Sequence, residues 1–208
     1  MQHFIAREIN GDKALLDPGE SHHLHRVLRL DSGAQVSVTD GEGKVWNCRV
    51  LKSDSKESVL KLEELRRIEQ KSHLHLALGP PKSKDRYHMV LEKATEWGVA
   101  SITPVRSFHS ERKVVKNERD ARVIQAAVKQ SKKGLIPRLH DLCSFQEFIQ
   151  NSQVCKQGFI AHLEDEPRTA LSAVNWQEET GVLIGPEGDF SPEEIQKAED
   201  AGWKGLDL

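Results

Sequence analysis

The chain has 208 residues, of which 37% are hydrophobic and 30% charged, the composition of a globular protein with room for a buried core. No stretch approaches the roughly 18 apolar residues of a membrane span, and the N-terminus lacks the apolar core of a signal peptide. The three cysteines form neither a CxxC motif nor an even set, which disfavours a disulfide scaffold and a cysteine zinc site and favours a reducing cytosol.

The net charge of -2 hides an uneven distribution along the chain. Residues 80–140 carry 14 basic and 6 acidic side chains, a net charge of +8, whereas residues 141–208 carry 4 and 14, a net charge of -10. A strongly positive block in a near-neutral protein is typical of a surface that binds a polyanion. The alternative is an exposed face of charged helices, and charge alone does not decide between the two.

The first 70 residues are predicted to form short strands and one helix. Residues 19–30 place Leu24, Val27 and Leu28 at helical spacing, and residues 40–43 (DGEG) are a hairpin turn. Such strands, closed around a short helix, predict a small barrel of roughly 65 to 70 residues, followed by a polar linker at residues 66–72. The strands are predicted at residues 3–5, 14–16, 35–38, 45–51 and 58–62.

From residue 74 onward the pattern alternates between strands and helices, which predicts an α/β domain with a mostly parallel sheet. Ser191, Pro192 and Glu194 form a capping box at the start of the last helix, which Gly202 ends. The strands are predicted at residues 74–78, 101–105, 158–163 and 181–184, and the earlier helices at 84–97, 118–133 and 144–151.

A glycine-rich loop at residues 185–190 (GPEGDF) lies between a buried strand and a helix start. In open α/β sheets ligands bind at this place, because the strand ends leave a crevice there. The chain has neither a GxxxxGK[ST] nor a GxGxxG motif, and Glu187 disfavours a phosphate and tolerates a cationic ligand. A tight turn without a ligand explains the same residues equally well.

The string GPEGDFSPEEI resembles the GPEGG-F-S-x-x-E signature of the RsmE-type 16S ribosomal RNA uridine-N3 methyltransferases, which belong to the SPOUT class. Four other segments agree with this family in the same order: HHLHRVLRL, EKATEWGVASITPV, SERKVVK and AAVKQSKKGLIP. Trp97, Asp189 and Lys132-Lys133 depart from the family's usual Leu, Gly and Arg. Its further segment L-G-x-R-I-L-R-x-E-T-A falls past Leu208, so the knot is expected to be incomplete within these residues.

The resemblance implies an α/β enzyme with a PUA-like β-barrel over residues 1–70 and a SPOUT domain with a trefoil knot over residues 71–208. It implies S-adenosyl-L-methionine as cofactor, ribosomal RNA or the small ribosomal subunit as partner, a homodimer and a cytoplasmic location, with no DNA or membrane partner. It assigns no general base. The residues that it places at the cofactor are Ala161, His162, Leu163, Gly185, Pro186, Glu187, Gly188, Leu206 and Leu208. For His162 a backbone partner is an equally good explanation.

The candidate RNA contacts come from two regions. Arg26 and Arg29 are three residues apart on the predicted helix, so both can contact one phosphate track. The others are in the positive block: Lys82, Arg86, Arg112, Lys113 and Lys133. The cluster His22-His23-x-His25 lacks a cysteine or carboxylate to complete a metal site, so an RNA-facing or capping role is preferred.

Three functions remain open at this point. The first is methylation of uridine N3 in 16S ribosomal RNA, and the second is methylation of another RNA by a SPOUT enzyme. The third is RNA binding without catalysis. Methyl transfer to ribosomal or transfer RNA separates the first two, and salt-sensitive RNA binding without cofactor binding marks the third.

Overall fold

The computed structural model describes residues 1–151, 155–163 and 168–207. The chain divides into two compact units. The first consists of Met1–Lys71 together with Ile124–Ile136, and the second of Ser72–Val123 together with Pro137–Leu208. Residues 124–136 thus belong to the first unit, although they fall within the second domain predicted over residues 71–208. No helix among the described residues is long and apolar enough to cross a membrane.

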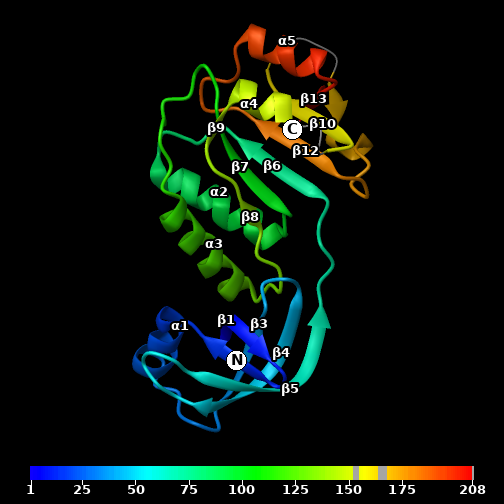
Figure 1. The fold of residues 1–208 in the computed structure, drawn as a ribbon. Coiled ribbons are helices and arrows are strands. Elements are labelled where there is room, and N and C mark those ends of the chain that lie inside the picture. The colour runs from blue at the N-terminus through cyan, green and yellow to red at the C-terminus, as the bar shows by residue number, and fades with distance from the viewer. Residues whose placement is uncertain (152–154, 164–167, 208) are drawn as a thin grey trace. The chain divides into compact units, whose positions relative to one another are not determined.

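The first unit is a closed five-stranded barrel, with the strands in the order β1-β2-β5-β4-β3 (Figure 1). The strands β1 and β3 pair in parallel and close it, and the other pairs are antiparallel. Side chains that alternate along these strands fill its interior, among them Phe4, Leu16, Val36 and Leu60. The strands are β1 (His3–Asn10), β2 (Lys13–Leu16), β3 (Gln35–Thr39), β4 (Lys44–Lys52) and β5 (Val59–Ile68). The predicted barrel is confirmed, although β5 runs into the predicted linker.

The predicted helix at residues 19–30 ends three residues early, at Val27, and changes type within its length. A short helix α1 (Pro18–His22) begins at Asp17, whose side chain accepts a hydrogen bond from the Glu20 N–H at 2.8 Å. It continues as a wider π-helix, η1 (His23–Val27), in which the Leu28 N–H donates to the His23 carbonyl at 2.9 Å. Arg29 follows with a left-handed backbone, φ +53°. Arg26 and Arg29 therefore do not lie on one helix.

Residues 132–134 are held by polar groups of the barrel. The Thr39 hydroxyl and the Gly43 N–H donate to the Gly134 carbonyl at 2.6 and 2.9 Å, and the Gly134 N–H donates to Glu69 at 2.8 Å. A ring nitrogen of His3 lies 3.1 Å from the Lys133 carbonyl. Helix α3 ends at Ser131, because Lys132 adopts φ +55°, so the predicted helix was two residues too long.

The second unit is an α/β domain built on one parallel sheet, as predicted. The strand order is β11-β13-β10-β12-β6-β7-β8, with β9 paired to β7, and every pair is parallel. The strands are β6 (Leu74–Leu78), β7 (Ser101–Arg106), β8 (Arg138–Leu139), β9 (Cys143–Ser144), β10 (Gln157–Ala161), β11 (Thr169–Ala170), β12 (Thr180–Ile184) and β13 (Lys204–Asp207).

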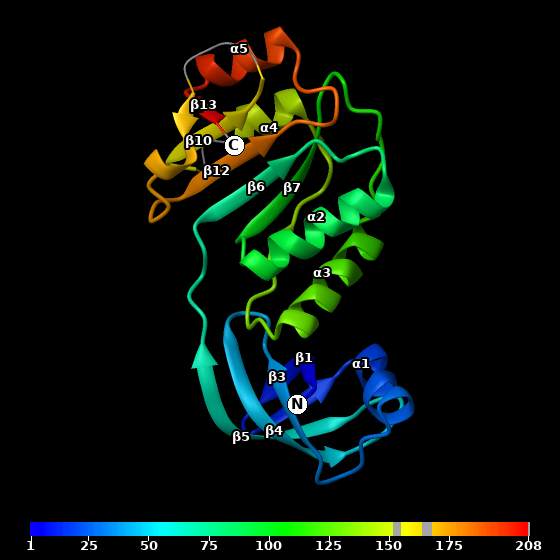
Figure 2. The ribbon, with the colours of Figure 1, turned by 180° about the vertical axis from the view of Figure 1, so that it is seen from behind.

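Helices cover both faces of this sheet, with α4 and α5 on one side and α2 on the other (Figures 1 and 2). Ile160 and Leu183 pack toward α4 and α5, whereas the neighbouring Phe159 and Val182 join a second core on the opposite face. The helices are α2 (Lys84–Trp97), α3 (Asn117–Ser131, shared between the units), α4 (Phe145–Asn151), α5 (Pro192–Asp200) and the 3₁₀ turn η3 (Leu171–Ala173).

His75 in β6 is a half-buried histidine with a shifted pKa. Its ring stacks on His140 with centroids 5.5 Å apart, and Nε2 lies 2.8 Å from the Thr103 hydroxyl. Burial, and secondarily the charge of His140, lowers the pKa of His75 to about 4. In the unfolded chain the pKa of His75 is about 6.5. Between pH 6.5 and 4 the unfolded chain therefore binds more protons than the folded protein, so the free energy of unfolding falls as pH falls.

We therefore expect His75→Gln to flatten the pH dependence of stability between pH 6.5 and 4. Glutamine keeps a hydrogen-bonding group but does not titrate, so the slope should fall by up to about 1.4 kcal/mol per pH unit. Urea unfolding at a series of pH values measures this slope. Thr103→Val is the control, because it removes the hydrogen-bond partner and keeps the imidazole. Equal slopes in both variants would contradict the assignment.

Candidate functional site

The carboxyl ends of three parallel strands meet at one edge of the second unit's sheet. Ala161, the last residue of β10, is in register with Ile184, the last residue of β12, and with Leu206 near the end of β13. Each of the three segments that follow was predicted from the sequence to contact a cofactor. Ala161 and Leu206 are more than 40 residues apart in the sequence, and the parallel register brings both to the same edge of the sheet.

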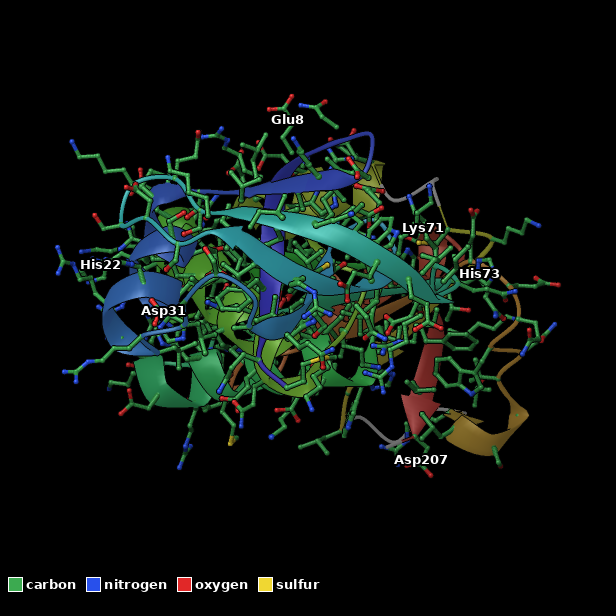
Figure 3. All side chains as sticks on the ribbon, turned by 90° about the horizontal axis from the view of Figure 1, so that it is seen from below. Glu8, His22, Asp31, Lys71, His73 and Asp207 are labelled. Carbon is green, nitrogen blue, oxygen red and sulfur yellow. The ribbon has the colours of Figure 1, made fainter. Side chains whose placement is uncertain are left out.

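These strand ends surround a cavity of about 240 Å³. Seven of the predicted cofactor residues line it: Ala161, His162, Leu163, Gly185, Pro186, Glu187 and Leu206. Gly188 is not among the lining residues, and Leu208 lies outside the described part of the chain. Sequence reasoning missed Arg168, Ile184, Asp189 and Asp207, which also line it, and Figure 3 shows Asp207 at the tip of β13. Of these four residues, only Asp189 was marked in the sequence, because it stands where the resembling family has glycine.

His162 lines this cavity, and both nitrogens of its ring are buried. The residue is 4% exposed, and neither ring nitrogen has a hydrogen-bond partner among the described residues. A buried polar atom without a partner costs free energy, so such atoms are typical of sites that a ligand or water completes. No described residue supplies the backbone partner considered for the His162 ring, although the His162 carbonyl accepts a hydrogen bond from Arg168 at 3.0 Å.

The loop after β12 approaches the end of β6 too closely for a side chain. A Cβ atom on Gly79 would lie 2.6 Å from the Pro186 ring, so only glycine fits there. The Gly79 N–H donates to the Ile184 carbonyl at 2.8 Å. The Glu187 carboxylate accepts from the Lys82 N–H at 3.1 Å, so it holds the loop at residues 80–82 and not its own turn.

Asp189 joins the two loops that face the cavity. One carboxylate oxygen accepts from the Leu163 N–H at 3.0 Å, and the other accepts from the Phe190 N–H at 2.8 Å. The backbone of Asp189 is left-handed, φ +59°, a conformation that aspartate tolerates better than most residues and glycine adopts freely. The substitution of the family glycine thus keeps the turn and adds a tie to the end of β10.

A third loop, after β7, is fixed to the same region. The Phe108 N–H donates to Glu194 at 2.9 Å, and this carboxylate also completes the capping box with Ser191 at the start of α5. His109 packs against Gly188, and its Nδ1 lies 3.3 Å from the Asp189 carbonyl. The predicted capping box is confirmed, and its Glu194 also holds the loop after β7.

A larger cavity, of about 630 Å³, lies elsewhere in the second unit. It lies at the amino-terminal ends of β6 and β7, around His75, Ser101 and His140. None of the predicted cofactor residues lines it. Ligands of open α/β sheets bind at the carboxyl ends of the strands, so the smaller cavity is the better candidate site.

Comparison with known proteins shows the family to which the chain belongs. A family described as an RNA methyltransferase domain matches residues 68–208, and an RNA methyltransferase PUA domain matches residues 16–63. The chain belongs to this RNA methyltransferase family. Ribosomal RNA small subunit methyltransferase E of Bacillus subtilis is 29% identical over 199 residues, which are 86% of this chain and 75% of that protein.

Two solved structures of similar proteins share the fold over the whole chain. A probable rRNA-methyltransferase from Porphyromonas gingivalis is 30% identical with a TM-score of 0.86, covering 99% of this chain and 88% of that one. A ribosomal RNA small subunit methyltransferase E from Neisseria gonorrhoeae, bound to S-adenosyl methionine, is 23% identical with a TM-score of 0.86. That match covers 100% of this chain and 89% of the gonococcal chain.

In this member of the RNA methyltransferase family, the predicted RNA-contacting residues fall into two groups. Arg112 donates to the carbonyls of Pro81 and Lys82 at 2.8 and 2.7 Å, and its guanidinium lies 5.8 Å from the Tyr87 ring centroid. Lys82 pairs with Glu111 at 2.7 Å. The other five have no ion pair or side-chain hydrogen bond within the described residues: Arg26, Arg29, Arg86, Lys113 and Lys133.

The histidine cluster of the first unit does not gather around one point. His22 lies at the outer surface (Figure 3), His23 contacts the Phe4 ring edge-on, and Nδ1 of His25 lies 3.0 Å from the Ser53 hydroxyl. Within the described residues no three His, Cys, Asp or Glu side chains are placed to hold a metal ion.

Arg112 should be a stabilising residue and its neighbour Lys113 should not. Arg112→Ala removes two charged hydrogen bonds and the contact with Tyr87, so we expect the free energy of unfolding to fall by about 1–3 kcal/mol. Lys113→Ala should change it by less than about 0.5 kcal/mol, because the exposed lysine has no ion pair or side-chain hydrogen bond to lose among the described residues. Urea unfolding of both variants measures the difference, and equal losses would contradict the role assigned to Arg112.

Proposed function

We propose that the protein transfers a methyl group from S-adenosylmethionine to N3 of a uridine in small-subunit (16S) ribosomal RNA. The observation that carries the proposal is the single cavity that gathers seven predicted cofactor residues from β10, β12 and β13. Membership of the RNA methyltransferase family and the likeness to small-subunit methyltransferases support it. The choice of uridine N3 rests on the family resemblance of the GPEGDFSPEEI segment.

The residues present fit this cofactor. The buried, unpartnered nitrogens of His162 can pair with a polar ligand, and the Gly185-Pro186 segment exposes backbone close to the cavity. The carboxylates at the cavity suit a ligand that carries a positive charge. A protein of the same fold, from Neisseria gonorrhoeae, binds S-adenosyl methionine. We infer that His162, Leu163, Gly185 and Leu206 would hold the cofactor here.

When bound, S-adenosylmethionine supplies an electrophilic methyl group and a positive charge that disappears on transfer. The protein's part is to hold the acceptor in line and to exclude water, because alignment alone can contribute several orders of magnitude to the rate. Uridine N3 must lose its proton as the new carbon–nitrogen bond forms. Glu187 is engaged with the Lys82 N–H, and no residue is assigned as the base.

Ribosomal RNA would bind through cations of the two units. Arg26 in η1 and Arg29 just after it are exposed, as are Arg86 and Lys113, whereas Lys133 is half-buried. The charged groups of these five side chains have no ion pair or hydrogen bond in the described chain and remain free for phosphates. Arg112 and Lys82 stay predicted contacts, although in this structure their charged groups already pair with protein atoms. The target nucleobase would also have to leave the base stack of structured RNA to reach the cavity.

The resemblance extends the proposal to assembly and location. We propose a homodimer, a trefoil knot at the cofactor site and a cytoplasmic location beside the ribosomal substrate. Light scattering on the intact protein measures the mass of the assembly. A mass of one chain at micromolar concentration would contradict the homodimer.

Incubation with labelled S-adenosylmethionine and unmethylated small subunits should yield 3-methyluridine, detected by nucleoside mass spectrometry. His162→Leu should lower kcat/KM by roughly tenfold, because it removes hydrogen bonds of about 1–2 kcal/mol to the ligand. Gln196→Ala, on the exposed face of α5, is the matched control.

Methylation of transfer RNA alone would contradict the ribosomal target and favour another RNA. RNA binding without any methyl transfer would favour the non-catalytic alternative.

The RNA surface is tested by its salt dependence. Arg26→Ala and Lys113→Ala should each weaken RNA binding and reduce the slope of log K against log [salt] by about one. Arg49→Ala is the control, because Arg49 is paired with Glu63 at 2.6 Å. Filter binding at several salt concentrations measures the slopes. An unchanged slope for both test variants would remove these residues from the proposed surface.

A further inference from the structure

We propose that the cavity distinguishes the cofactor from its demethylated product by charge, and that Asp189 is a determinant of this preference. The inference rests on the proposed function and concerns the same site. It assigns to Asp189 a role that a glycine at this position cannot have, since glycine carries no charge.

The described lining of the cavity is acidic. Three of its side chains are carboxylates, Glu187, Asp189 and Asp207, and Arg168 is the one cation among the described lining residues. No ion pair joins Arg168 to any of the three in the described structure, and its recorded hydrogen bond goes to the His162 carbonyl at 3.0 Å. The described residues therefore leave a net negative charge at the cavity.

The carboxylate of Asp189 is fixed in place. Its two oxygens accept hydrogen bonds from the N–H groups of Leu163 and Phe190, at 3.0 and 2.8 Å. The Asp189 N–H donates to the Pro186 carbonyl at 3.0 Å, which closes the turn. Because both backbone donors are neutral, these bonds orient the carboxylate without neutralising it.

The two ligands of this site differ by one charge. Methyl transfer breaks a carbon–sulfur bond, and the pair of electrons of that bond stays on sulfur, so the sulfonium cation becomes a neutral thioether. The adenosine and amino-acid parts are the same in both ligands, so His162 can pair with either. A fixed negative charge favours the cation alone. The acidic lining should therefore bind S-adenosylmethionine more tightly than S-adenosylhomocysteine and speed release of the product.

Isothermal titration calorimetry on the intact protein tests this, with S-adenosylmethionine, S-adenosylhomocysteine and sinefungin as ligands. Sinefungin carries an ammonium group in place of the sulfonium and cannot transfer a methyl group. Asp189→Asn removes the charge and keeps an acceptor oxygen, so the Kd of both cationic ligands should rise roughly three- to tenfold, as expected for one partly solvated charge. The Kd of S-adenosylhomocysteine should change less than about twofold.

Two further variants separate charge from geometry. Asp189→Gly suits the left-handed backbone and removes both the charge and the tie to Leu163, so it should show the same charge-dependent loss. Asp200→Asn, at the far end of α5, makes the same charge change away from the cavity and should leave all three ligands unaffected.

Equal weakening of charged and neutral ligands by Asp189→Asn would overturn the inference and leave Asp189 a purely geometric role. No weakening of either would also overturn it, while cofactor binding itself would still stand. If the wild-type protein bound none of the three ligands, the proposed function would fail together with this inference, a result distinct from the other two.

Discussion

The parallel pairing of β10 with β12 and β13 is the constraint on which the rest of the site depends. Parallel strands send all their carboxyl ends to one edge, so Ala161, Ile184 and Leu206 reach the same level although distant segments supply them. The hydrophobic core on each face of the sheet holds that register. A shift of the strands by one residue would turn Phe159 and Val182 toward α4 and α5. It would also move Ile160 and Leu183 to the face opposite these helices.

The loops that leave this edge are held mostly by hydrogen bonds between a side chain and a backbone group. Glu187 holds the loop after β6, Asp189 holds the end of β10, and Glu194 holds the loop after β7 while it caps α5. Arg112 adds a second tie to the loop after β6. Each carboxylate accepts from backbone donors that a loop would otherwise leave to water, so the cavity has preformed walls before any ligand binds.

The sequence was most informative where a pattern has a local physical cause. The capping box at Ser191 and the strand at residues 181–184 are set by neighbouring residues, and both were predicted. The end of the helix at residue 27 was not, because the turn widens into a π-helix through contacts that helical spacing does not encode. The four short strands β8, β9, β11 and β13 were also missed, since each has at most four residues and is stabilised by its neighbours in the sheet.

The site residues show the same division between local and tertiary causes. The glycine-rich loop could be singled out because its glycines and the helix start lie within one short segment, whereas the strand ends were proposed from the family resemblance. The role of Arg112 could not, since a cation in a basic block looks the same whether it faces phosphate or two carbonyl groups brought to it by folding. Asp189 is intermediate between these cases: the sequence marks it as a departure from glycine, and its left-handed backbone explains why aspartate is tolerated. The hydrogen bond from the Leu163 N–H to this carboxylate, by contrast, joins residues 26 positions apart and is known only from the folded structure.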